Sequence, residues 1–370
     1  MSEFRTITDA APLRLVQVGA GGMGRAWIRT ITANPDVELV GLVDINTDAA
    51  HAALEQAGLS GIVVGTSTAE VAAQSGAHAV VNVTVPAAHH PVNVEALFVG
   101  LPVLCEKPAA PTVAQALSLA AAASVSGELL MISQSRRYYP ELAQLRAIAG
   151  ELGEIGAVTT EFFKAPHFGG FREQMPHVLL VDMAIHAFDA ARYVLDADPV
   201  AVYCEEWNPG FSWFDGAANA TATFEFEGGT RYVYTGSWCA DGIETSWNGT
   251  WRITGAGGSA TWDGEGMPRL QRLDEPTVTT PDAADSGAAR EIAGSLAEFV
   301  SVLRSGQTPS GEIHSNVYSL AMVEAAVRSA ETGARVRLAA VLDEAHREAL
   351  AAERRDDVRA DLERSSVLTS

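Results

Sequence analysis

The stretch LRLVQVGAGGMGR, residues 13–25, places an apolar run directly before three glycines in the pattern G-x-G-x-x-G. In such a turn the first glycine, here Gly19, permits a tight bend, and the second, Gly21, lets the main chain approach a pyrophosphate. The third, Gly24, allows a helix to pack closely on the strand, and the first N–H groups of that helix bind phosphate oxygens. The sequence therefore predicts a dinucleotide-binding turn, with Gly22 and Met23 inside it.

Asp44 ends the next apolar run, 25 residues after Gly19. A carboxylate at this place accepts hydrogen bonds from the ribose hydroxyls of a dinucleotide and repels a 2′-phosphate. This pattern predicts NAD as the cofactor in preference to NADP. The alternative is that Asp44 is a turn residue, or the N-cap of a helix that begins near Thr47.

Apolar runs alternate with alanine-rich segments through the first third of the chain. Runs that are apolar throughout are typical of strands covered on both faces, so the alternation predicts an α/β Rossmann domain with a doubly wound parallel sheet over residues 1–134. The expected strands are 13–19, 37–44, 78–85, 101–106 and 128–134, and the expected helices are 22–33, 47–57, 68–74, 89–99 and 112–126.

The pattern changes after residue 134. We expect an α+β domain with a large, mostly antiparallel open sheet at 135–340, followed at 341–370 by a charged helical tail without a continuous apolar stripe. The expected strands are 220–226, 230–238 and 249–255, and the expected helices are 138–150, 178–194, 290–305 and 315–332.

Acidic residues outnumber basic ones by 46 to 25, which gives a formal charge of −21. Such a surface repels phosphate backbones, so we expect no nucleic-acid partner. No apolar run is long enough to span a bilayer, and the N-terminus lacks the segments of a signal peptide, so a cytoplasmic protein without a membrane partner is expected. Cys105, Cys204 and Cys239 show neither metal nor disulfide spacing and are interpreted as packing residues.

Only two of the cationic side chains are lysines, Lys107 and Lys164. A chain that otherwise uses arginine is expected to retain lysine where a compact ammonium is required. Lys107 follows the fourth expected strand, and ligands of open α/β sheets bind at the carboxyl ends of strands. This position indicates that Lys107 faces the nicotinamide. The alternative is a surface lysine paired with Glu106.

The apolar helix expected at 178–194 is interrupted by Asp182, His186 and Asp189. Spacings of four and three place all three side chains on one stripe of a regular α-helix, and buried carboxylates need a partner. A catalytic stripe, a satisfied salt-bridge network and a divalent-metal site are all compatible with this pattern. The metal site is disfavoured because no third close ligand is evident, and no metal is expected.

With the glycine turn, Glu-Lys-Pro at a strand end and Asp-x-x-x-His-x-x-Asp on a helix, the chain resembles the glucose–fructose oxidoreductase/inositol dehydrogenase/MocA family. The resemblance runs from about residue 13 to 338 and includes VTVPAAHHPVNVEAL (83–97) and PSGEIHSNVYSLAMVEAA (309–326). It implies catalytic positions at Lys107, Asp182 and His186 and cofactor-side positions at Gly19, Gly21, Gly24, Asp44 and Glu106. The run HVLLVD and Ala184 depart from the glycines that the family commonly has there, which bears on the substrate.

The resemblance implies hydride transfer from the secondary hydroxyl of a sugar, sugar derivative or cyclitol. His186 is then the general base, because an imidazole accepts a proton near neutral pH. Lys107 would stabilise negative charge on the reacting oxygen. Asp182 would hold Lys107 or a substrate hydroxyl, and Asp189 would orient the imidazole.

A group of cationic residues precedes this helix in the sequence. The candidate substrate-binding residues are Arg136, Lys164, His167, Arg172 and Asp189. They indicate recognition of an anionic group on a sugar, unless the cations merely balance nearby acids. Of the aromatic residues between Trp207 and Trp251, one or two are candidates for stacking on a sugar, and the others for the core or a subunit interface.

Two further functions share these features. One is an NAD-dependent glycoside hydrolase that oxidises, eliminates, adds water and returns the hydride, possibly on a carboxylated or sulfonated glycoside, with Tyr138, Tyr139 or His167 as a second acid/base. The other is a non-catalytic dinucleotide sensor. In each case we expect a homodimer or homotetramer formed through the C-terminal sheet, since a broad open sheet face is usually covered.

Overall fold

The computed structural model describes residues 4–9, 11–275, 277–281 and 288–365, and the chain divides into two compact units. One unit consists of Met1–Ser135, Ala289–Val317 and Asp343–Ser370, and the other of Arg136–Ala288 and Tyr318–Leu342. The units are therefore not contiguous in the chain. Segment 289–317, which the sequence assigns to the second domain, packs with the first unit.

The first unit has a six-stranded parallel sheet in the order β3-β2-β1-β4-β5-β6. This is the strand order of the Rossmann fold, as predicted, and we call this part the Rossmann unit. Its strands are β1 (Leu13–Val18), β2 (Val37–Val43), β3 (Val63–Gly65), β4 (Ala79–Asn82), β5 (Val103–Glu106) and β6 (Leu130–Ser133). Only β3 was not expected, because it is a three-residue edge strand that is half-buried.

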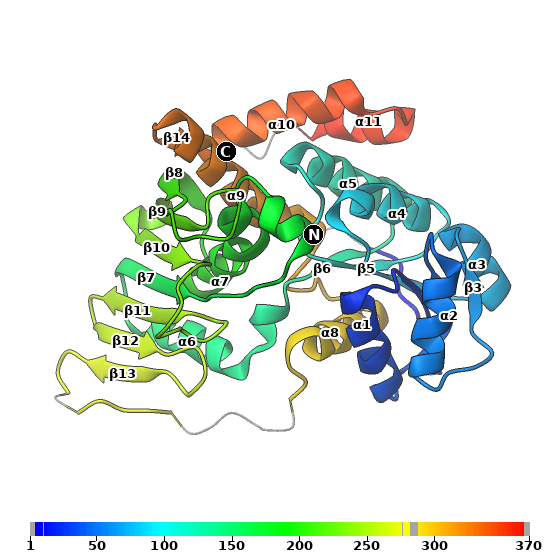
Figure 1. The fold of residues 1–370 in the computed structure, drawn as a ribbon, viewed down its shortest axis with the longest axis horizontal. Helices are drawn as coiled ribbons and strands as arrows, with labels where there is room; N and C mark the ends of the chain where they lie inside the picture. The colour runs from blue at the N-terminus through cyan, green and yellow to red at the C-terminus, as the bar shows by residue number, and fades with distance from the viewer. Residues whose placement is uncertain (1–3, 10, 276, 282–287, 366–370) are drawn as a thin grey trace. The chain divides into compact units, whose positions relative to one another are not determined.

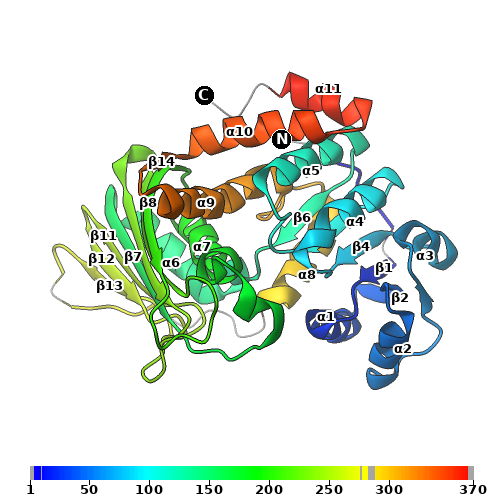
Figure 2. The same ribbon diagram turned by 45° about the horizontal axis from the view of Figure 1, so that its top comes forward.

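Helices connect these strands (Figures 1 and 2): α1 (Gly22–Ala33), α2 (Thr47–Gln56), α3 (Thr68–Ser75), α4 (Pro86–Phe98) and α5 (Val113–Ser126). Three of them begin at a side-chain cap, where Asn46, Ser67 or Thr112 accepts a hydrogen bond from a main-chain N–H three residues further on. Such caps satisfy donors that the first helical turn leaves unpaired. Asp44 therefore does not cap α2, because Asn46 does.

Two later segments complete the Rossmann unit. After α8 (Glu291–Ser305), the main-chain N–H of Ile132 on β6 donates to the Gly311 carbonyl at 2.8 Å. The tail forms α10 (Leu338–Ala352) and α11 (Asp356–Arg364), while residues 366–370 lie outside the described residues. In α11, Val358 and Leu362 are buried four residues apart, so the expectation of a tail without an apolar stripe is wrong for this helix. Two apolar residues suffice for so short a helix.

The second unit, which we call the sheet unit, has an eight-stranded sheet in the order β13-β12-β11-β7-β10-β9-β8-β14. Its strands are β7 (Ile155–Phe163), β8 (Pro199–Trp207), β9 (Asn219–Phe226), β10 (Arg231–Ser237), β11 (Thr250–Gly255), β12 (Gly258–Trp262), β13 (Arg269–Arg272) and β14 (Val336–Arg337). All pairs are antiparallel except β7 with β10, which confirms the mostly antiparallel sheet.

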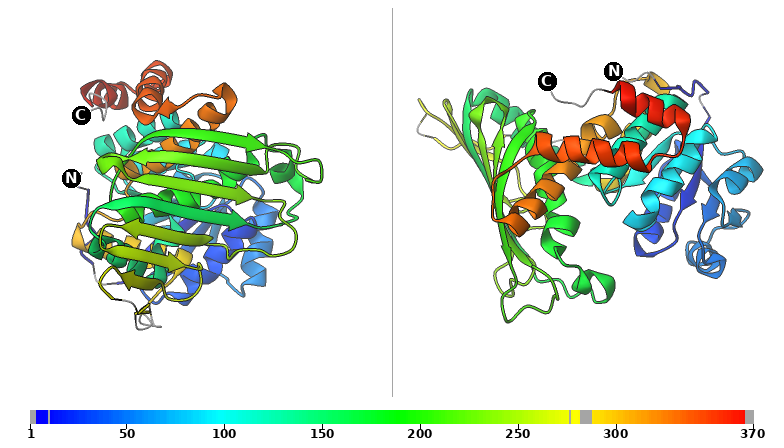
Figure 3. Two further views of the ribbon diagram at one scale, coloured as in Figure 1. Left: turned by 90° about the vertical axis from the view of Figure 1, so that its left-hand side faces the viewer. Right: turned by 90° about the horizontal axis from the view of Figure 1, so that it is seen from above.

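Helices of this unit cover one face of the sheet, and the other face is seen without helices in the left view of Figure 3. They are α6 (Pro140–Glu151), α7 (Ile185–Leu195) and, from residue 318 on, α9 (Ile313–Thr332). The core between them is aromatic: the ring of Phe188 on α7 lies 4.7 Å from Phe224 and 5.3 Å from Tyr234, both on strands. Across the described residues, every helix is too short or too polar to cross a membrane.

Candidate functional site

The glycine turn joins β1 to α1 in the Rossmann unit, and each of its three key glycines meets a different constraint. Gly19 has φ +106°, and a Cβ there would lie 2.7 Å from the Val83 carbonyl oxygen. A Cβ on Gly24 would lie 2.3 Å from the Gly19 carbonyl oxygen, so the helix packs too closely for a side chain. At Gly21, in contrast, a Cβ would meet no described atom within 4 Å. The glycine at this position therefore leaves open space, into which a ligand fits.

The side chains of Gln17 and Asp44 hold this turn in place through hydrogen bonds to its main chain. Gln17 is fully buried, and its amide donates to the carbonyl oxygens of Gly19 at 2.8 Å and Gly24 at 2.9 Å. The Asp44 carboxylate accepts from the main-chain N–H of Ala20 at 2.8 Å and of Asn46 at 2.8 Å. Asp44 thus ties the end of β2 to the turn, next to the open space above Gly21.

These residues fit a dinucleotide such as NAD. The exposed main chain at Gly21 and Gly22 and the N-terminus of α1 offer N–H donors for a pyrophosphate. Asp44 has lone pairs beyond those used by the two N–H groups and would accept ribose hydroxyls. Met23, 48% exposed, borders the same turn.

Lys107 follows β5 directly, at the carboxyl end of the same sheet. The carboxylate before it, Glu106, is buried and accepts from the Trp27 indole N–H at 2.8 Å and from the Lys107 N–H at 3.2 Å. Burial raises the pKa of Glu106, while the Trp27 hydrogen bond and the Lys107 charge lower it. Glu106 thereby ties α1, which carries the glycine turn, to the strand end that carries the lysine.

On the other side of Lys107 the chain is held by His89 of α4. Its Nδ1 lies 2.6 Å from the Pro108 carbonyl oxygen and its Nε2 lies 3.1 Å from the Thr84 carbonyl oxygen. Burial lowers the pKa of His89, although both carbonyls oppose this and the Lys107 charge adds to it. Sequence reasoning assigned no role to Trp27 or His89, although His89 lies in the quoted segment 83–97.

In the sheet unit, the helix at 178–194 is not a regular α-helix. Leu179–Ala184 form a π-helix, and α-helical winding begins only at Ile185. The winding changes between Asp182 and His186, whereas His186 and Asp189 both lie in the α-helical part. π-Helical turns of this kind are frequent at functional sites.

The three side chains go to different surroundings. Asp182 is partly exposed and pairs with Arg172 of the short 3₁₀-helix Gly170–Gln174, at 2.7 Å between Oδ2 and Nε. His186 borders a small cavity of about 20 Å³, enough for one water molecule. Arg136, Trp247 and Asn248 lie on the same cavity wall.

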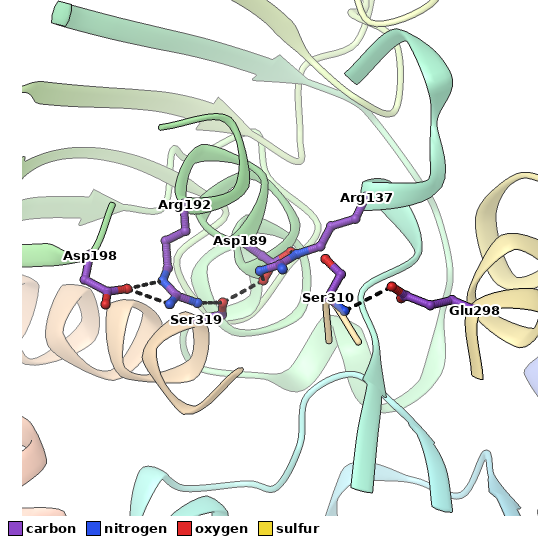
Figure 4. Close-up of polar contacts among 7 residues, drawn as sticks. All are labelled: Arg137, Asp189, Arg192, Asp198, Glu298, Ser310 and Ser319. Atoms are coloured by element: carbon purple, nitrogen blue, oxygen red, sulfur yellow. Dashed lines mark hydrogen bonds and ion pairs between the residues drawn. The ribbon is translucent and has the colours of Figure 1, made fainter. Parts of the chain in front are cut away.

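Asp189 lies in a buried network (Figure 4). Its carboxylate accepts from Arg137 Nε at 2.7 Å and Nη2 at 2.8 Å, and from the Ser319 hydroxyl at 2.6 Å. Ser319 in turn accepts from Arg192, which pairs with Asp198. Because Asp189 is completely buried and engaged on both oxygens, the structure assigns it to the core and not to substrate contact. Its desolvation cost is offset by the bidentate arginine.

The remaining predicted substrate residues all have protein partners. Lys164 pairs with Glu244, and His167 stacks on Trp213 with ring centroids 3.8 Å apart. An Nη of Arg136 donates to the Tyr139 hydroxyl at 3.2 Å. Within the described part of the chain, no three His, Cys, Asp or Glu side chains are grouped so as to hold a metal ion.

A Rossmann unit with an open glycine turn, followed by a separate α+β sheet unit, defines a class of dinucleotide-dependent oxidoreductases. Residues 13–134 match the family model described as an oxidoreductase family with an NAD-binding Rossmann fold, and residues 142–261 match the GFO/IDH/MocA C-terminal domain. The chain belongs to the Gfo/Idh/MocA family, as the sequence motifs predicted, and its Rossmann unit is an NAD-binding domain.

Individual relatives agree with this assignment. Inositol 2-dehydrogenase 4 of Saccharopolyspora erythraea is 30% identical over 307 residues, which cover 74% of this chain and 86% of that protein. The uncharacterized protein y4oX of Sinorhizobium fredii is 26% identical over 346 residues, or 88% of this chain and 95% of that protein. The solved structure of an oxidoreductase from Agrobacterium radiobacter in complex with NAD⁺, L-tartaric acid and magnesium has a TM-score of 0.81 at 20% identity, covering 90% of this chain and 100% of that one. At 20% identity, the similarity to the Agrobacterium structure shows a shared fold and nothing about the substrate.

Proposed function

We propose that this protein is an NAD-dependent dehydrogenase that oxidises a secondary hydroxyl of a sugar, sugar derivative or cyclitol. The observation that carries the proposal is Lys107, which stands at the carboxyl end of β5 in the same sheet as the open glycine turn. Trp27 and His89 fix the chain on either side of it. The inositol dehydrogenase among the relatives supports the substrate class.

Each residue has a distinct role in this proposal. The glycine turn and Asp44 would hold NAD, which would supply the hydride acceptor for the carbinol carbon. The Lys107 ammonium donates a hydrogen bond to the reacting oxygen and stabilises negative charge as the O–H proton leaves. The His186 imidazole accepts that proton. Asp182 orients a substrate hydroxyl together with its partner Arg172.

Arg136, Arg172 and His167 are proposed as hydrogen-bond donors to substrate oxygens. Because Arg172 pairs with Asp182 and Lys164 with Glu244, this group has little net positive charge to offer an anion. A glycosidase acting on an anionic glycoside and a non-catalytic NAD sensor are therefore kept as outcomes of the experiment and not as further proposals.

The experiment incubates the purified protein with NAD and a panel of sugars, cyclitols and nitrophenyl glycosides. Absorbance at the NADH band and release of nitrophenol are followed in the same samples. Accumulation of NADH with a sugar or cyclitol supports the proposal. Nitrophenol release without NADH contradicts it in favour of the glycosidase, and tight NAD binding with neither signal contradicts it in favour of the sensor.

We also propose that the sheet face without helices joins copies of this chain into a homodimer or homotetramer. Tyr203 and Trp207 are four residues apart on β8, so they share one face of the strand, and they are 43% and 47% exposed. Sedimentation velocity should show an oligomer that Tyr203→Asp weakens. A wild-type monomer at micromolar concentration would contradict the proposal.

A further inference from the structure

The loop between β10 and β11 is tied to the end of β7 in the sheet unit. The Glu244 carboxylate pairs with Lys164 and accepts from the Ala165 N–H at 2.8 Å. Next to it, Phe163 and Thr245 exchange two hydrogen bonds: the Phe163 N–H donates to the Thr245 hydroxyl at 3.0 Å, and the Thr245 N–H donates to the Phe163 carbonyl at 3.0 Å. The loop is thus fixed just before the residues that border the cavity.

Trp247 lies in this loop, two residues after Thr245. Its ring lies 5.1 Å from the Lys164 ammonium and 6.2 Å from the Phe162 ring, and it borders the same cavity as His186. Even so, 41% of its surface is exposed. A large aromatic ring held in place on one side and open on the other provides a flat apolar surface for a ligand.

Asn248 continues the wall. Its side-chain N–H donates to the Gly264 carbonyl at 2.8 Å, and its main-chain carbonyl accepts from the Trp251 indole at 2.8 Å. These bonds fix the amide, yet its buried Oδ1 has no hydrogen-bond partner among the described residues. Buried acceptors are usually satisfied, so this oxygen indicates a missing donor, which is either a water molecule in the cavity or a ligand hydroxyl.

Three cations of the sheet unit are engaged by acids of the same unit. Lys164 pairs with Glu244 and Arg172 with Asp182, while Arg137 is engaged by the buried Asp189. An anionic substrate would have to compete with these carboxylates for their cations. An uncharged ring does not.

We propose that residues 244–248 form one wall of the substrate subsite beside His186, a proposal that rests on the sugar or cyclitol substrate proposed above. Trp247 packs on the C–H face of an uncharged sugar or cyclitol ring, and Asn248 Oδ1 accepts a hydrogen bond from one of its hydroxyls. Lys164 is a positioning residue that holds the loop through Glu244. The second lysine of the chain thus acts on the substrate only through Trp247.

The test measures binding by calorimetry with the full-length protein saturated with NADH, so that no oxidation occurs. The probes are myo-inositol, D-glucose and its anionic counterpart D-glucuronate. We expect the best uncharged ring to bind more tightly than glucuronate, and Trp247→Ala to weaken its binding about 10- to 100-fold. The matched control is Ile243→Ala in the same loop, since Ile243 is fully exposed and does not border the cavity; it should leave binding unchanged.

The role of Lys164 has its own readout. Lys164→Met should weaken ring binding several-fold in the wild-type background and have no further effect in Trp247→Ala, because it acts through that ring. Equal losses in both backgrounds would overturn the positioning role. Tighter binding of glucuronate, absence of binding by every uncharged ring, or equal behaviour of Trp247→Ala and Ile243→Ala would overturn the subsite.

Failure of the dehydrogenase proposal gives a different result. If uncharged rings bind in a Trp247-dependent manner but NAD is never reduced, the subsite stands and the oxidation does not. If NADH accumulates while Trp247→Ala leaves KM and kcat unchanged, the oxidation stands and the subsite does not. With both in place, Trp247→Ala should raise KM much more than it lowers kcat, since ring packing is the same in ground and transition states.

Discussion

In the Rossmann unit the candidate cofactor site is made mainly of main chain, whereas in the sheet unit the proposed substrate site is made of side chains that hold one another in pairs. Gly19, Gly21 and Gly24 shape the cofactor turn by lacking a Cβ. In the sheet unit, Asp182 depends on Arg172, and Trp247 depends on a loop fixed through Lys164. The geometry of the first site depends on local main-chain conformation. The geometry of the second depends on contacts between side chains that are distant in sequence.

The largest effect should come from the most buried side-chain pair of the sheet unit. Asp189→Asn leaves Arg137, whose side chain is 8% exposed, as an uncompensated buried charge, and should lower the free energy of unfolding by about 3–5 kcal/mol. Chemical denaturation measures this. The control Asp196→Asn removes an exposed pair with Arg146 and should cost less than about 1 kcal/mol. Equal effects would show that pairing does not hold this unit together.

Lys107→Ala tests the catalytic role proposed for this side chain of the Rossmann unit. We expect kcat/KM to fall about 10²- to 10³-fold, as when a donor to a developing oxyanion is removed. The dissociation constant of NAD should change only a few-fold, because the glycine turn is untouched. Lys107→Arg should also be impaired, since a guanidinium does not reproduce a compact ammonium. Steady-state kinetics and NAD titration provide the measurements, and a wild-type rate in either variant would remove Lys107 from the mechanism.

Two variants of the glycine turn distinguish an effect on protein stability from an effect on NAD binding. Gly24→Ala places a Cβ 2.3 Å from the Gly19 carbonyl oxygen and should destabilise the protein by roughly 1–3 kcal/mol. Gly21→Ala meets no described atom within 4 Å, so its stability should stay within about 0.5 kcal/mol of wild type. Its NAD affinity should nevertheless fall, because the added methyl occupies the approach of the pyrophosphate. Unchanged NAD binding in Gly21→Ala would argue against that placement of the cofactor.

The smallest effect is expected in the tail, beyond the segments that the family models match. Ser118 of α5 donates to Glu353 at 2.7 Å, so Glu353→Gln should cost about 0.5–1 kcal/mol at neutral pH. Burial raises the pKa of Glu353, but the N–H groups of Arg355 and Arg354 and the Ser118 hydroxyl lower it overall. A lowered carboxyl pKa stabilises the fold above the ordinary value of 4.5 and not below it. The difference between wild type and variant in urea unfolding should therefore shrink as the pH falls below 4.5; a constant difference would contradict the assignment.

The part of the candidate site that could be predicted is the part whose geometry depends on residues close together in the sequence. The G-x-G-x-x-G turn and Asp44 were found because glycine geometry and a strand-end acid leave a signature within 25 residues. The sheet unit was predicted in outline, but strands such as β7 and β8 were missed. Their residues alternate less clearly, and β7 pairs with β10 and β11, which are distant in sequence, although β8 pairs with β9, the next strand along the chain.

The substrate side escaped prediction for a physical reason. Lys164 and Glu244 are 80 residues apart, and nothing in either segment shows that they meet. Asp189 was interpreted as a functional acid because its buried partners, Arg137 and Ser319, lie 52 and 130 residues away in the sequence. The π-helical winding of Leu179–Ala184 is likewise announced by no residue pattern.

That winding makes the helix unusually sensitive to chain length. A π-turn holds one residue more than the α-turn it replaces, so losing a single residue between Leu179 and Ala184 would let ordinary winding resume. The residues on the two sides of the deletion would then keep about the same facing, because the wide turn accommodates its extra residue locally. One codon lost in this segment would therefore remove the wide turn that precedes His186.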